Sequence, residues 1–473
     1  MRQMSPMDAF MYYVDSPRTP NVITFVNLHD QSTVPGGRLT FRDILRGVES
    51  RLDRSRAFRE KIAPVPLHLD HPYWVADPDF DLEFHVRHIA LPAPGDWRQL
   101  CILVARLASR QLDLTRPPWE MWVVEGLDGV EGVPPGGFAV VLRIHHSAID
   151  GVAGAEILSA LTTTSPDEEP APPVAPWRPE PAPSELRRLA GAGVHLATRP
   201  THLLSRIRPL AGAGVRLARE RHPLPVFRVP KTRFNHRVGP HRVWDATGWP
   251  LEEVKRIRAL APGSTVNDVV LAVVAGALRG YLAAHDELPA ASLVSLVPVS
   301  LRSVRGPDAV GNEIASMAVP LHTDVADPVA RFRRIRSSTQ ASKARKQAVG
   351  ARTLTETAAV MPGGTIGLAF RAQSGLAELT GTQAGPNTSI TNVPGPTVPL
   401  YFLGARLVGS WGVAPLSDGV GLFHIASSYV GQLTLSFTAD RAMMPDPARY
   451  ADCLRASFEE LAAAGHAHAG KLG

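Results

Sequence analysis

Apolar and polar positions along the first 163 residues follow two periods, which together predict a mixed α/β domain. Alternating or continuous apolar runs rich in β-branched and aromatic residues are typical of strands, whereas apolar positions three and four apart are typical of helices. The strand-like runs cover residues 21–28, 119–125 and 138–144, and the helix-like stretches cover residues 41–51 and 97–112. Residues 1–163 are therefore predicted to form an N-terminal domain.

The pattern breaks at residue 164, where a proline-dense segment begins and continues to Pro183. Such composition is typical of a linker. Two similar segments, residues 189–197 and 210–218, follow it among many arginines. On helices they would carry one apolar and one basic face, which favours contact with a membrane surface. The alternative is a pair of solvated linker helices packed on the protein body. Residues 164–229 are thus interpreted as a linker with basic amphipathic helices.

From residue 230 to residue 473 the periodicity again predicts an α/β domain. Helical spacing appears at residues 265–282 and 446–464, and a long helix rich in arginine and lysine at residues 325–348. Strand-like runs cover residues 292–299, 388–393, 422–428 and 432–439. A chain of 473 residues exceeds one ordinary core, so two domains agree with its length.

The net charge of +6 favours anionic partners such as a phosphorylated cosubstrate or an acidic membrane surface. Nucleic acid is disfavoured because the sequence has no nucleic-acid-binding motif. Cys101 and Cys453 lie far apart without metal-ligand spacing, which indicates reduced thiols in the cytoplasm. The first residues lack the apolar core of a signal peptide, and the apolar run 266–278 is too short to span a bilayer. Any membrane contact is therefore expected to be peripheral.

The candidate chemistry lies in His145-His146-Ser147-Ala148-Ile149-Asp150-Gly151, between an apolar strand-like run and a helix-like stretch. Imidazole exchanges a proton near neutral pH without a metal, so a histidine at a strand end can act as a general base. Two other interpretations stay open at this point. The histidines could be structural, or His146 and Asp150 could bind a metal with a third ligand.

Motifs of rival enzymes are absent from the sequence. It has no Gly-x-Ser-x-Gly nucleophile elbow, no phosphate loop ending in Gly-Lys-Ser/Thr and no Gly-x-Gly-x-x-Gly fingerprint. This argues against a serine hydrolase, a nucleoside triphosphatase and a dinucleotide enzyme.

The His-His-x-x-x-Asp-Gly motif resembles the active-site signature of the bacterial wax ester synthase/acyl-CoA:diacylglycerol acyltransferase family, within the CoA-dependent acyltransferase superfamily. Further segments resemble the family in order along the chain. They are Met4-Ser5-Pro6-Met7-Asp8, residues 80–87, residues 91–95, residues 114–120, Asn267-Asp268-Val269-Val270-Leu271-Ala272, residues 297–302, Gly311-Asn312 and residues 391–396.

The resemblance implies two α/β domains of the chloramphenicol acetyltransferase type that face each other across an interdomain tunnel. It implies transfer of a long-chain acyl group from acyl-CoA to diacylglycerol, giving triacylglycerol, or to a fatty alcohol, giving a wax ester. Acyl-CoA would be a substrate, with no cofactor and no metal. The protein is expected in the cytoplasm, associated with the inner face of the plasma membrane or with lipid droplets. The remaining alternatives are another CoA- or carrier-dependent acyltransferase, forming an amide or a polyketide ester, and a non-catalytic lipid-binding relative.

The site residues divide by expected role. His146 is the predicted base, His145 supports the loop, and Asp150 beside Gly151 is expected to pair with Arg302 or to cap a helix. Asn267 and Asp268 are expected either to cap their helix or to line the site from the C-terminal domain. The resemblance places Asn392 at the domain interface, whereas an ordinary turn is the alternative. Pro117 and Trp119 are predicted substrate contacts, with core packing as the alternative for Trp119.

Two departures from the family pattern bear on the substrate. Pro118 replaces the leucine of the family's Pro-Leu-Trp segment, which alters a wall near the site but not its proton chemistry. His236 and Arg237 add bulk and charge in a segment where the family has Leu-Asn-Gly-Pro, so the acceptor preference is open.

Overall fold

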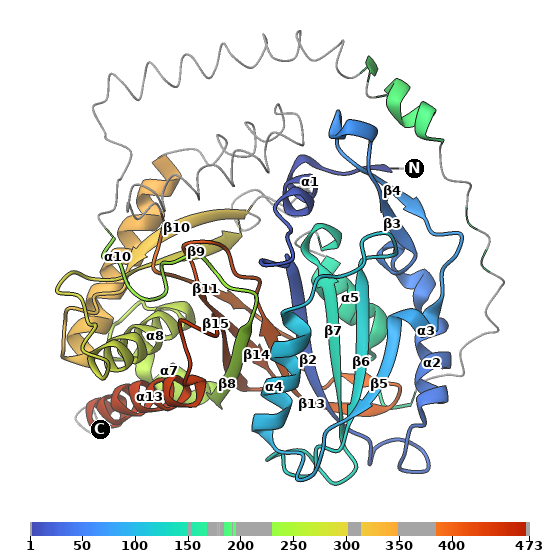
Figure 1. Cartoon of the computed structure of the whole chain (residues 1–473). Helices are drawn as coiled ribbons and strands as arrows, with labels where there is room; N and C mark the ends of the chain where they lie inside the picture. Colours follow the sequence, from blue (N-terminus) through green and yellow to red (C-terminus); the bar gives the residue numbers. More distant parts are fainter. Residues whose placement is uncertain are drawn as a thin grey trace.

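The computed structural model contains two six-stranded sheets that lie side by side, each with helices on its outer face (Figure 1). We refer to residues 2–167 as the N-terminal half and to residues 229–469 as the C-terminal half. The structure describes residues 2–149, 153–167, 177, 179, 184–191, 193–194, 229–300, 314–348 and 385–469.

The sheet of the N-terminal half has the strand order β12-β13-β2-β7-β6-β5. Only the β5–β6 pair among these strands is parallel. The bounds are β2 Val22–Asp30, β5 Val86–Ala90, β6 Trp119–Glu125, β7 Phe138–His145, β12 Tyr401–Phe402 and β13 Ala405–Val413.

Strand β7 is buried along its whole length because helices cover both faces of the sheet. Its even-numbered residues pack in a core with α2 (Phe41–Glu49) and α5 (Ala153–Leu161). Ala139 and Val141 pack on the other face with α4 (Trp97–Ala108). A strand enclosed on both faces reads as a continuous apolar run, as residues 138–142 do before the buried Arg143, which pairs with Glu120.

A smaller sheet of order β1-β4-β3 lies beside the start of the chain. Its strands are β1 Arg2–Gln3, β3 Glu60–Ala63 and β4 Tyr73–Ala76, and the helices near it are α1 Pro6–Tyr13 and α3 Leu82–His85. Single 3₁₀ turns cover Leu52–Arg54, Arg56–Phe58, Pro66–His68 and His146–Ala148. Helix α1 lies against the last of these turns.

The sheet of the C-terminal half has the order β10-β9-β11-β14-β15-β8. Figure 1 shows α7, α8 and α13 on the side of this sheet that faces away from the N-terminal half. The strands are β8 Arg242–Pro250, β9 Val294–Ser300, β10 Ile314–Pro320, β11 Thr388–Val393, β14 Leu422–Tyr429 and β15 Gln432–Asp440. The helices are α7 Leu251–Arg258, α8 Val266–Ala283, α10 Pro328–Ala348 and α13 Pro447–Ala469.

Helix α8 is the centre of the C-terminal core and is mostly buried there. By length and composition alone it is the one helix among the described residues that could cross a membrane. It is longer than the apolar run 266–278, because its last turn continues to Ala283.

The two halves share a sheet, a feature that the sequence pattern does not predict. Strand β13 of the C-terminal half pairs antiparallel with β2, so residues 401–413 complete the N-terminal sheet. The pairing satisfies backbone groups that β2 would otherwise expose at a sheet edge. Helix α4 also packs on β8, where Trp97 contacts Trp244.

Candidate active site

The candidate site begins where β7 ends at His145 and the chain turns through His146–Ala148. Neighbouring segments hold the backbone at both histidines. The amide of His145 donates to the Pro118 carbonyl at 2.9 Å, and the amide of His146 donates to the Asn21 carbonyl at 2.8 Å. The two imidazoles therefore start from backbone positions with little freedom.

The ring of His145 is fully buried and its tautomer follows from its neighbours. The backbone N–H of Ser147 lies 3.2 Å from Nδ1, and the Ser147 hydroxyl lies 2.7 Å from the same atom. Because a backbone N–H can only donate, Nδ1 accepts and the ring proton is on Nε2. Nε2 in turn lies 3.7 Å from Oδ1 of Asp15. His145 is thus a neutral, oriented side chain.

His146 is half-buried at the start of the turn. Burial lowers its pKa from the ordinary value, a backbone hydrogen bond partly offsets this, and the neighbouring His145 lowers the pKa further. A histidine with a lowered pKa is unprotonated at neutral pH, which is the form that a base requires.

Asp150, Gly151 and Arg302 lie outside the described residues, as do Gly311 and Asn312. Among the described residues no group of three histidine, cysteine or acidic side chains could hold a metal ion.

Asp268 is part of a capping box at the start of α8. Thr265 is the N-cap of α8. Its backbone amide and its hydroxyl donate to Oδ2 of Asp268, at 2.7 and 2.8 Å. Oδ1 accepts from the Thr339 hydroxyl at 2.7 Å, which ties α8 to α10. Both carboxylate oxygens are thus used within the C-terminal core. Asn267, one residue earlier, is half-buried.

Asn392 lies in β11 opposite Ala426 of β14 and is half-buried. It occupies a strand position next to the last residue of β11, so the residue is part of the sheet and not of a turn. Pro394 and Gly395 follow directly after the end of β11.

Pro117, Pro118 and Trp119 lie beside the end of β7. Trp119 is 2% exposed, donates its indole N–H to the Phe58 carbonyl at 2.9 Å and stacks on His85 at 4.6 Å. Trp119 therefore packs in the core. The departure at Pro118 leaves the contact with His145 intact, because the acceptor there is a backbone carbonyl.

Sequence reasoning missed three polar residues that surround the histidine pair: Asp15, Asn21 and Gln111. They come from the loop after α1 and from the segment after α4, and they meet at the end of β7. Nothing in their spacing relates them to His145, so only the arrangement of the strands brings them together.

The arrangement of two sheets with a histidine site at the end of a central strand defines a known class of protein. The first condensation domain of the calcium-dependent antibiotic synthetase has this fold: it is 15% identical, with a TM-score of 0.55, over 98% of this chain and 97% of that one. The wax ester synthase/diacylglycerol acyltransferase of Marinobacter aquaeolei VT8 is more similar, at 27% identity and a TM-score of 0.70 over 98% of this chain and 100% of that one.

The family follows from the sequence matches. The model of the wax ester synthase/diacylglycerol acyltransferase catalytic domain matches residues 4–270, and that of the family's C-terminal domain matches residues 310–462. A Mycobacterium tuberculosis protein named "Putative diacyglycerol O-acyltransferase" is 34% identical over 98% of this chain and 90% of its own length. This chain belongs to the wax ester synthase/diacylglycerol acyltransferase family. The predicted family, fold class and acyltransferase enzyme class are confirmed.

Proposed function

We propose that this protein transfers a long-chain acyl group from acyl-CoA to diacylglycerol, to a fatty alcohol, or to both. The observation that carries the proposal is His146, a half-buried neutral imidazole on a tightly held turn. The names of this protein's relatives supply the substrate class, because those names include diacylglycerol O-acyltransferase and wax ester synthase.

In the proposed reaction a ring nitrogen of His146 removes the proton of the acceptor hydroxyl. The oxygen attacks the thioester carbonyl carbon and a C–O bond forms. The C–S bond then breaks, and the leaving thiolate takes the proton from the His146 imidazolium to give free CoA. A thioester is already activated, so one base suffices without a covalent enzyme intermediate.

The other site residues have supporting roles in this proposal. His145 orients the loop, and Asp150 pairs with Arg302 or caps the following helix beside Gly151. Asn267 and Asn392, both half-buried, line the proposed tunnel from the C-terminal half, and Asp268 supports that side by capping α8. Pro117 contributes to the wall along the acyl chain, and Trp119 packs in the core behind it.

We also infer a three-part chain organisation. Residues 1–163 form the domain that carries the histidines, residues 164–229 the linker with basic helices, and residues 230–473 the second domain. The two separate six-stranded sheets support this division into two domains. One exception is that β12 and β13, which belong to residues 230–473, complete the sheet of the first domain.

The lipid substrates favour a cytoplasmic protein bound peripherally to the inner membrane face or to lipid droplets. The described part of the basic segment agrees with this. Leu186 is 79% exposed beside the exposed Arg187, and Val194, further along the segment, is 62% exposed. Exposed apolar side chains in a segment that also exposes an arginine fit an anionic lipid surface.

The function is tested by following CoA thiol release from palmitoyl-CoA with diacylglycerol and with hexadecanol in parallel, and by analysing the lipid products. Triacylglycerol or hexadecyl palmitate is the expected product. Release with neither alcohol would overturn the proposal, and transfer only from a carrier-protein thioester would assign the chain to another acyltransferase reaction.

Membrane contact is tested by cosedimentation with vesicles that contain anionic lipid. Deletion of residues 184–222 is expected to release the protein into the supernatant. A matched variant, Leu186→Ser with Val194→Ser, separates the apolar contribution from that of the arginines. Unchanged binding of the deletion variant would show that this segment is not the membrane contact.

A further inference from the structure

The loop between α1 and β2, residues 14–21, reaches both the histidine pair and the C-terminal half. Its residue Asp15 has a side chain only 6% exposed. Oδ1 of Asp15 accepts from the Asn21 amide at 2.6 Å, and Oδ2 accepts from Nε2 of Gln111 at 2.6 Å. The Asp15 carboxylate thus connects the beginning of the loop to its end at Asn21, and it also binds the loop to Gln111 in the segment after α4.

Two contacts connect this loop to the histidines. The Asn21 carbonyl accepts from the His146 amide at 2.8 Å. Oδ1 of Asp15 lies 3.7 Å from Nε2 of His145, the ring nitrogen that carries the proton. This distance exceeds a hydrogen bond, so the carboxylate faces the N–H dipole of the neutral ring without a direct hydrogen bond.

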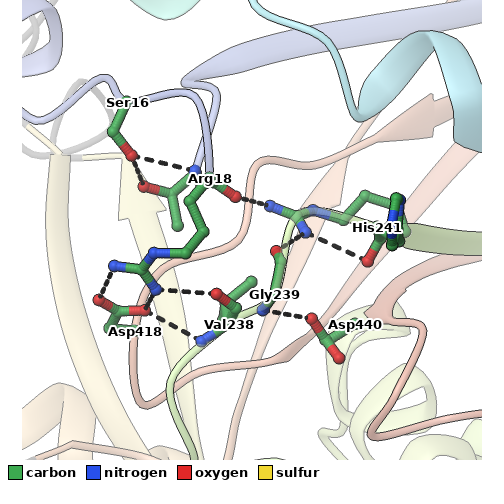
Figure 2. A network of polar contacts seen from close by, with 9 residues as sticks. Ser16, Arg18, Val238, Gly239, His241, Asp418 and Asp440 are labelled. Atoms are coloured by element: carbon green, nitrogen blue, oxygen red, sulfur yellow. Dashed lines mark hydrogen bonds and ion pairs between the residues drawn. The ribbon is translucent and has the colours of Figure 1, made fainter.

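Arg18 of the same loop is bound to the C-terminal half (Figure 2). Its guanidinium donates to both carboxylate oxygens of Asp418, at 2.6 and 2.8 Å, and to the Val238 carbonyl at 2.8 Å. Nη2 of Arg242 donates to the Arg18 carbonyl at 2.7 Å. A bidentate arginine–carboxylate pair specifies orientation as well as proximity.

We propose that Asp15 is a positioning residue for acyl transfer, and that Arg18 with Asp418 holds the same loop, and hence His146, in register with the C-terminal half. The inference rests on the proposed function, in which His146 is the base and the two halves enclose the substrates. Asp15 acts through Asn21 and His145 and does not itself exchange a proton with substrate.

The first test is Asp15→Asn in the full-length protein. An amide has one acceptor oxygen, so either the Asn21 amide or Gln111 loses its acceptor and meets another donor. We expect kcat to fall by up to about 100-fold, the effect of misplacing a reacting group by about 1 Å. KM for palmitoyl-CoA and for the alcohol is expected to stay near the wild-type value, and Asp15→Glu should recover part of kcat.

The second test removes the link to the C-terminal half with Asp418→Asn. We expect a smaller fall in kcat, again at nearly constant KM. The matched control is Glu287→Gln, which breaks the bidentate Arg233–Glu287 pair, with both contacts at 2.6 Å, inside the C-terminal half alone. That variant should keep the wild-type kcat.

Hydrogen exchange measured by mass spectrometry reports on the loop without any substrate. In Asp15→Asn we expect faster exchange in the peptide that contains the His146 amide and no change in residues 432–440. Wild-type kcat in Asp15→Asn, or faster exchange spread equally over both peptides, would overturn the positioning role. Absence of CoA release by the wild-type protein would instead overturn the proposed function, while the exchange measurement would still show whether Asp15 holds the loop.

Discussion

Two histidines, one in each half of the molecule, both have a pKa lowered by burial but differ in what their surroundings allow them to do. His424 lies within β14 of the C-terminal sheet and is fully enclosed. Its Nε2 lies 2.7 Å from the Tyr450 hydroxyl and its Nδ1 lies 3.2 Å from the Thr388 hydroxyl. His146 lies just beyond the end of β7 and is half-buried.

Burial lowers the pKa of both histidines, and for His424 it does so to about 3. Both rings are therefore neutral at pH 7. The difference lies in what surrounds them, because the His424 nitrogens are both occupied inside a core that leaves no room for a substrate. A lowered pKa alone does not identify a base; the position at a strand end distinguishes His146.

The largest effect is expected for His146→Ala. Loss of a general base typically costs about 10²–10⁴-fold in rate, so CoA release should fall by about three orders of magnitude. The thermal midpoint should stay close to the wild-type value, since the ring is only half-buried. Substantial activity in this variant, measured by thiol release, would remove the distinction between the two histidines.

His424→Ala is expected to affect stability and not activity, because it removes the partner of the buried Tyr450 hydroxyl and opens a cavity. The free energy of unfolding should fall by roughly 3 kcal/mol. Urea unfolding measures this change, and kcat per folded molecule should not change. An unaltered unfolding midpoint would show that these contacts add little to stability.

The pH dependence of stability follows from the buried histidines. Burial also lowers the pKa of His29, to about 4. Below about pH 6.5 the unfolded chain binds protons at these positions before the folded protein does. Each histidine then reduces stability by about 1.4 kcal/mol per pH unit, until its folded pKa is reached. Urea titrations between pH 7 and pH 5 should show this fall, and His424→Ala should show a shallower one.

The smallest effect is expected for Asp268→Asn, which weakens the capping box of α8. The loss should be about 1 kcal/mol in the free energy of unfolding. If capping is its whole role, kcat should stay near the wild-type value, because both carboxylate oxygens of Asp268 are bonded within the C-terminal core. A large fall in kcat with intact stability would show instead that Asp268 acts in the site from the C-terminal half.

Much of this architecture could be predicted from periodicity. The buried run 138–144, the capping pattern before Val266 and the proline-dense segment after residue 163 each have a local physical cause. Strand β13 could not be placed in this way, because alternation along 405–413 says nothing about which sheet receives the strand. Backbone pairing with β2 is a long-range property.

The sequence by itself determined the family and the candidate base, since His145, His146 and Asp150 belong to one short motif that matches the family signature. Only the tertiary structure decided how that base is held. Asp15, Asn21 and Gln111 approach the end of β7 from separate segments, and Arg18 binds Asp418 across 400 positions of the chain. Local propensity and spacing carry no information about such contacts, because they exist only after the two sheets have packed together.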